Sequence, residues 1–92
     1  MRAEGTLPDI SRFYGVSVKM YPADHAPAHF HVVYGDHEAL FAIDTLEMFR
    51  GDLPRRAVPL VLEWAMTRRD ELRASWAQAQ AGKPLLPVPP LE

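Results

Sequence analysis

The chain has 92 residues, with ten basic and twelve acidic side chains for a formal net charge of −2, nine prolines and no cysteine. Its composition, 48% hydrophobic and 24% charged, is typical of a globular protein long enough to bury one core, so we expect residues 1–92 to form a single domain. Because cysteine is absent, disulfides, iron–sulfur clusters, thiolate-bound zinc and cysteine nucleophiles are excluded, and any metal would need histidine and carboxylate ligands.

The first half of the chain is predicted to form a sheet over residues 12–50, after an irregular segment at residues 1–11. Apolar and polar side chains alternate from Arg12 to Tyr21, which predicts one strand, and the prolines at positions 22 and 27 bound a loop that follows it. Residues 29–34 and 37–43 flank a Gly-Asp turn and predict a hairpin. Residues 46–50 predict a short fourth strand.

The second half is predicted to form one long helix over residues 53–81, because apolar residues recur there at spacings of three and four. Asp52 stands at the expected N-cap. Pro59 lacks a backbone N–H, so either the first turn is kinked or the regular helix starts near Pro59. Gly82 ends the helix, and the proline-rich residues 82–92 form an extended tail against the body. The predicted fold is α+β: a three- or four-stranded, mostly antiparallel meander covered on one face by a long helix.

The histidines are the feature that needs an explanation, because all four fall in one acidic stretch. Residues 24–49 contain five acids, no lysine or arginine, and His25, His29, His31 and His37. Side chains two apart on a strand share a face, so His29 and His31 are expected to lie together.

A metal site is one interpretation of this cluster. A third ligand for His29 and His31 would come from His25, or from Asp36, His37 or Glu38 at the end of the hairpin. Mixed nitrogen and oxygen ligands suit zinc, iron or nickel, so a divalent ion of this kind is the candidate cofactor.

Acid–base catalysis is a second interpretation, for example a ribonuclease in which His29 and His31 exchange protons with the substrate. Arg12 and Tyr14 on the first predicted strand would then supply cationic or phenolic groups toward a phosphate. Two further interpretations remain open: the histidines are half-buried structural residues, or they form a protonation-sensitive surface for a partner.

Arg55 and Arg56 at the predicted start of the helix are candidates for contact with an anion or a partner. Arginine pairs on an amphipathic helix are ordinarily part of a solvated face, and the acidic stretch is a poor landing surface for a polyanion. Nucleic acid is therefore a weakly supported partner.

Several segments resemble a known family: PDISRFYG at residues 8–15, MY at 20–21, DHAPAHFHVVYG at 24–35, GDLPRRA at 51–57 and LEWA at 62–65. They are similar to small bacterial proteins grouped as domain of unknown function 4160, and the resemblance covers the chain from about residue 8 to its end. It implies the following candidate site residues, and His37 is not among them: Arg12, Tyr14, His25, His29, His31, Arg55 and Arg56.

The resemblance also implies a partner from a second small group, domain of unknown function 2442, in two-gene modules similar to toxin–antitoxin pairs. The leading functional expectation is therefore a partner-binding component of such a module, with a small protein partner or a second copy of the chain. The alternatives are a small histidine-dependent enzyme, either a metal-assisted hydrolase or a ribonuclease, and a purely structural cluster. The first residues lack a signal-peptide core and no run is long and apolar enough for a membrane span, so we expect a cytoplasmic protein without a membrane partner.

Overall fold

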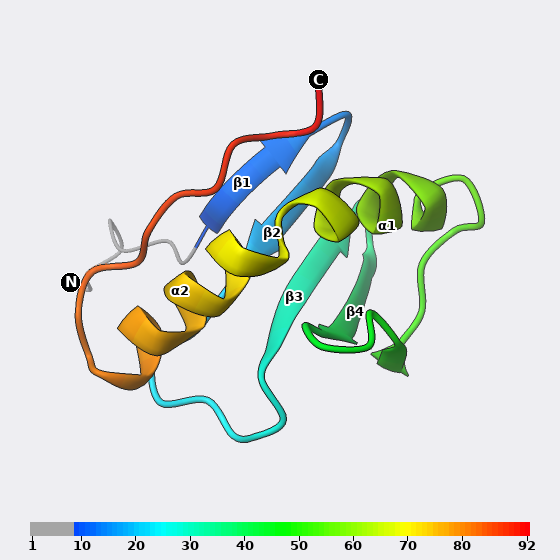
Figure 1. Cartoon of the computed structure of the whole chain (residues 1–92). Helices are drawn as coiled ribbons and strands as arrows, with labels where there is room; N and C mark the ends of the chain where they lie inside the picture. Colours follow the sequence, from blue (N-terminus) through cyan, green and yellow to red (C-terminus); the bar gives the residue numbers. More distant parts are fainter. Residues whose placement is uncertain (1–8) are drawn as a thin grey trace, which may run out of the picture.

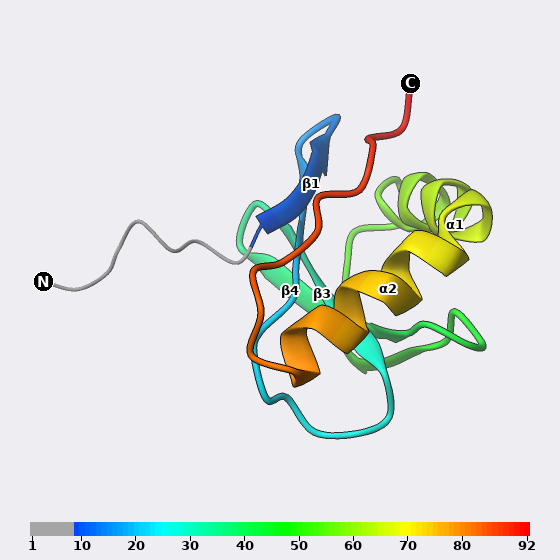
Figure 2. The same cartoon turned by 60° about the vertical axis from the view of Figure 1, so that its left-hand side comes forward.

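A meander of alternating strands forms the sheet, and two amphipathic helices cover one face of it (Figures 1 and 2). The structure is a computed structural model that describes residues 9–92. Its elements in chain order are β1 (Asp9–Phe13), β2 (Val16–Lys19), β3 (His29–Tyr34), β4 (His37–Ala42), β5 (Met48–Gly51), α1 (Val58–Thr67) and α2 (Arg69–Gln80). The strands lie in sequence order, and each pairs antiparallel with the next. The predicted α+β class and antiparallel meander are confirmed.

The prediction of three or four strands is wrong, because the segment predicted as one strand from residue 12 to 21 folds into a hairpin. Tyr14 and Gly15 have φ values of 48° and 83°, as a tight hairpin turn requires, so β1 and β2 lie on either side of them. β1 begins at Asp9, which corrects the irregular segment for residues 9–11, whereas residues 1–8 lie outside the described part of the chain.

The single helix predicted over residues 53–81 is also wrong, because it begins later and is divided at Arg68. α1 starts at Val58, with Pro59 in its first turn, and its N-cap position is occupied by Ala57 instead of Asp52. Arg68 leaves helical geometry at φ −121° and ψ 18°, and its N–H donates to Ala65, three residues back. The two helices therefore cross the sheet in different directions (Figure 1).

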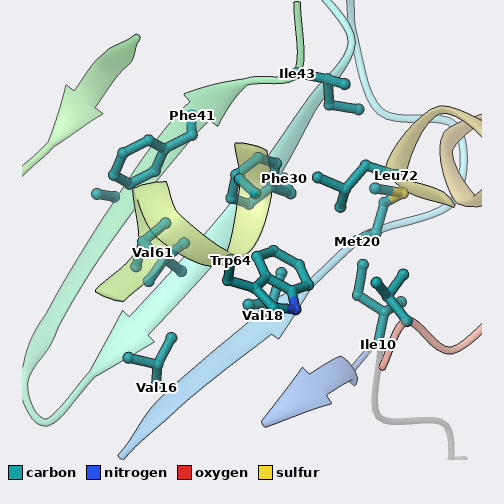
Figure 3. Packing of buried hydrophobic residues seen from close by; sticks show 14 of the residues in the cluster. Ile10, Val16, Val18, Met20, Phe30, Phe41, Ile43, Val61, Trp64 and Leu72 are labelled. Atoms are coloured by element: carbon teal, nitrogen blue, oxygen red, sulfur yellow. The ribbon is translucent and has the colours of Figure 1, made fainter. Parts of the chain in front are cut away.

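The core lies between this helical layer and the inner face of the sheet. Trp64 of α1 packs against Phe30 and Phe13, with ring centroids 5.9 and 5.2 Å away, and Figure 3 shows it at the centre of the cluster. Leu72 of α2 is also fully buried. Because side chains alternate along each strand, the residues between these core positions face outward.

One outward-facing row crosses four strands and positions the site described below. Lys19 of β2 pairs with His31 of β3, His31 pairs with Leu40 of β4, and Leu40 pairs with Arg50 of β5. Neighbouring strands are about 4.8 Å apart, so the four side chains form a nearly straight line across the sheet.

The proline-rich tail packs along β1 and the helices, as expected (Figure 2). The N–H of Val88 donates to the carbonyl of Ile10 in β1 at 2.8 Å, and the indole of Trp64 donates to the carbonyl of Pro89 at 2.8 Å. Ser75 of α2 donates to the carbonyl of Leu86 at 2.6 Å. Within residues 9–92, no helix has the length and apolar character needed to cross a bilayer.

Candidate metal centre

A compact cluster lies at the start of β3, where the β2–β3 loop enters the sheet, and it consists of Asp24, His29 and His31. The Oδ2 atom of Asp24 lies 3.0 Å from Nε2 of His29 and 3.0 Å from Nε2 of His31. One potential ligand atom from each of the three residues lies within 4.8 Å of the others. The described part of the chain therefore contains a group that is able to hold a metal ion.

The strand and the loop place these residues by different means. The two-residue spacing puts both histidines on the outer face of β3. Asp24 is brought to them because the β2–β3 loop is attached to the end of α2: the N–H of Ala23 donates to the carbonyl of Ala79, and the Gln80 amide donates to the carbonyl of Asp24 at 2.8 Å.

The Nδ1 atoms of both histidines have partners that fix how the rings are oriented. Nδ1 of His29 lies 2.7 Å from the carbonyl of Pro27, and a carbonyl only accepts, so this nitrogen carries the proton and donates. Nδ1 of His31 lies 3.2 Å from Oε2 of Glu38 and donates in the same way when it carries the proton. When the rings are neutral, the lone pair of each Nε2 points toward the Asp24 carboxylate.

Such a convergence is unfavourable unless something positive lies between these atoms, because neutral Nε2 and an ionised carboxylate oxygen are both acceptors. A second proton on each ring or a metal ion would remove the conflict. Metal-bound histidines ordinarily donate their other N–H to a carbonyl or carboxylate, and Pro27 and Glu38 are partners of those two kinds.

The Asp24 carboxylate itself is held in its ionised form. Burial raises its pKa, but the hydrogen bond with His31, the backbone N–H of His25 and the positive charge of the two imidazoles when they are protonated lower it by more, so the net pKa lies below 3.8. An ionised carboxylate at neutral pH is the form that coordinates a metal.

Aromatic rings enclose the two imidazoles. The Tyr21 ring meets His31 edge-on at 4.6 Å between centroids, and Phe49 meets His29 edge-on at 5.7 Å. Trp76 of α2 lies 5.2 Å from His29, which is only 4% exposed. This packing limits rotation of the rings and lowers the local dielectric constant, which strengthens electrostatic interactions at the cluster.

A small open cavity of about 160 Å³ adjoins the cluster. Asp24 and His29 form one wall, and Leu40, Phe49 and Arg50 line other parts of it. A ligand in this cavity would therefore contact two of the three candidate metal ligands.

His25 and His37 lie outside the ligand group. His25 lines the cavity and its N–H donates to Oδ1 of Asp24 at 3.1 Å, but its ring contributes no ligand atom. Nδ1 of His37 lies 3.6 Å from Oδ2 of Asp52. The predicted third ligand His25 is thus replaced by its neighbour Asp24.

The other predicted site residues lie away from the cluster. Tyr14 lies in the β1–β2 turn, next to the end of β3 opposite the cluster, because Val16 is the strand partner of Tyr34. Arg12 forms an ion pair with Asp9, with Nε 3.0 Å from Oδ2. Arg56 donates to the Tyr34 hydroxyl at 3.1 Å at that same opposite end.

Arg55 lies in the turn before α1 and is not part of the cavity lining. Neither it nor the other three of these predicted residues shares a contact with the histidines in the described part of the chain.

Asp24 is the member of the candidate ligand group that the sequence interpretation missed, since an aspartate between two prolines is ordinarily a turn residue. The sequence signal was its position in the loop directly before the strand that carries His29 and His31. A short loop lies at the same end of the sheet as the start of the strand that follows it.

The model of a protein family described as Domain of unknown function (DUF4160) matches residues 15–77, which include all three cluster residues. No curated protein and no solved structure matches the chain.

Proposed function

The chain belongs to the family of domain of unknown function 4160, and we propose that it is a small metal-dependent enzyme that binds one divalent transition-metal ion through Asp24, His29 and His31. The observation that carries the proposal is the orientation of the imidazoles. Pro27 and Glu38 accept from the two Nδ1 atoms, and both Nε2 atoms converge on one oxygen of the Asp24 carboxylate.

The spacing of the ligand atoms agrees with a coordination shell. Two atoms bound about 2.1 Å from one ion and at right angles to each other are about 3.0 Å apart. Asp24 Oδ2 lies 3.0 Å from each Nε2. Tetrahedral positions at the same bond length are about 3.4 Å apart, so the observed separation lies within about 0.5 Å of either geometry.

The donor set selects the class of ion and the class of centre. Two imidazoles favour zinc, iron or nickel over calcium and magnesium, which prefer oxygen ligands. Three protein ligands leave positions for water or substrate, as in catalytic and not in structural sites. The ion would supply Lewis acidity there, while the protein fixes the ligands and gives access through the adjoining cavity.

Metal titration with matched histidine variants tests this proposal. We expect one equivalent of zinc or cobalt(II) to bind to the unmodified protein and to His25→Ala and His37→Ala, because neither ring is in the ligand group. His31→Ala and Asp24→Asn should bind at least a hundredfold more weakly while circular dichroism shows an intact fold.

Equal binding by all four variants would show non-specific histidine binding and would contradict the proposal. So would an absence of metal binding in the unmodified protein. The partner-binding role in a two-gene module and the ribonuclease alternative stay predictions.

A further inference from the structure

Arg50 is a cation at the edge of the candidate metal centre with no assigned task. It lines the cavity beside Asp24 and His29, and among residues 9–92 its guanidinium has no hydrogen-bond or ion-pair partner. An arginine that no acid of residues 9–92 pairs with, at the edge of a cavity beside a candidate metal site, is suited to bind an anion.

The register of the sheet explains why Arg50 faces the centre. It pairs with Leu40, which pairs with His31, so Arg50 and His31 lie two strands apart in one outward-facing row. Their Cα atoms are therefore about 10 Å apart, a distance that the long arginine side chain and a small ligand together span.

Lys19, at the other end of the row, gives a useful contrast. It flanks His31 on β2, but its ammonium group is held by Asp9. Arg50 is therefore the cation of this row that no acid of residues 9–92 holds.

The charges around the cavity indicate the charge of the ligand. A divalent ion would be offset by the carboxylates of Asp24 and Glu38, and Arg50 then leaves one net positive charge. A monoanion would neutralise this charge.

Size and lining indicate the rest of the ligand. A cavity of about 160 Å³ is smaller than ordinary drug-sized pockets, so it matches a small ligand. Leu40 and Phe49 give the cavity apolar surface beside the guanidinium.

We propose that the cavity binds a small organic monocarboxylate, with its carboxylate on Arg50, its carbon skeleton against Phe49 and Leu40, and its far end at the metal. The inference rests on the proposed metal centre and names the substrate class for it. The planar guanidinium matches a carboxylate with two parallel hydrogen bonds, which distinguishes this site from a simple point charge.

Cobalt(II)-loaded protein provides the test, because a ligand at the ion changes its visible absorption. We expect pyruvate to change the spectrum with saturation. Arg50→Gln should raise the Kd for pyruvate at least tenfold, while the matched control Arg55→Gln changes it less than twofold, and all three proteins should bind cobalt(II) equally.

Several results would overturn the inference while leaving the metal centre intact: a spectrum that pyruvate does not alter, an unchanged Kd in Arg50→Gln, or tighter binding of inorganic phosphate than of pyruvate. A protein that binds no cobalt(II) would overturn the metal centre and, with it, the carboxylate site.

Discussion

Replacing Gly51 with alanine should destabilise the protein and displace β5, the strand that carries Phe49 and Arg50. Gly51 has φ +79°, and a Cβ atom there would lie 2.1 Å from the Glu38 carbonyl oxygen and 2.9 Å from Cα of Ala39. Both atoms belong to the β4 backbone, so the overlap is relieved only when the strands separate by about 1 Å or more, since carbon atoms pack at about 3.5 Å.

The cost has two parts. A side chain at positive φ costs about 1–2 kcal/mol, and loosening the hydrogen bonds between β4 and β5 adds about 1–2 kcal/mol. The second part includes the bond from the Asp52 N–H to the Glu38 carbonyl at 3.2 Å. We expect the free energy of unfolding to fall by about 3 kcal/mol.

Urea denaturation followed by circular dichroism measures this loss, and two other glycines serve as matched controls. Gly35 and Gly82 have φ +58° and +69°, but a Cβ atom at either position would have nothing within 4 Å. Their alanine variants should lose only the conformational part, about 1–2 kcal/mol. If Gly51→Ala costs no more than these controls, the close approach of β4 and β5 does not limit the fold, and the reasoning is wrong.

Three further predictions concern the supporting residues. Glu38→Ala should weaken metal binding about tenfold by removing the acceptor for Nδ1 of His31, and an unchanged titration would contradict this role. Leu72→Ala, at a fully buried position, should lower the free energy of unfolding by about 2–5 kcal/mol in urea. Burial raises the pKa of Asp9, but Lys19 and the Arg12 guanidinium lower it by more, so the net pKa lies below 3.8. The ionised carboxylate therefore stabilises the fold above pH 3.8, and this contribution is lost as the pH falls through the lowered pKa. Asp9→Asn should therefore cost about 0.5–1 kcal/mol at pH 7 and progressively less as the pH falls below 3.8, and a cost that does not change with pH would refute the assignment.

Local patterns were sufficient for part of the fold. The alternation around Phe30 and Phe41 identified the β3–β4 hairpin, because both strands have one buried face. The β1–β2 hairpin was missed, since Tyr14 at positive φ is uncommon and masks the turn that Gly15 allows.

The helix break was missed for a related reason. Arg68 is neither glycine nor proline, and the apolar stripe continues from Val61 to Ala79 without a change of phase. The periodicity of the sequence therefore gives no sign of the break at Arg68.

The candidate site divides in the same way. His29 and His31 were predicted together because strand geometry alone places them on one face. Asp24 depends on contacts between its loop and the end of α2, and Arg50 depends on the register of β4 and β5. These are contacts between segments far apart in the chain, which periodicity does not encode.

Nitrogen-15 NMR of the histidine rings during zinc titration tests the central claim most directly, because it reports each ring nitrogen separately. We predict that the Nε2 signals of His29 and His31 shift on binding one equivalent of zinc while their Nδ1 atoms stay protonated, and that the signals of His25 and His37 do not change. A shift at Nδ1, or equal shifts in all four rings, would contradict a centre built from Asp24 and the two Nε2 atoms.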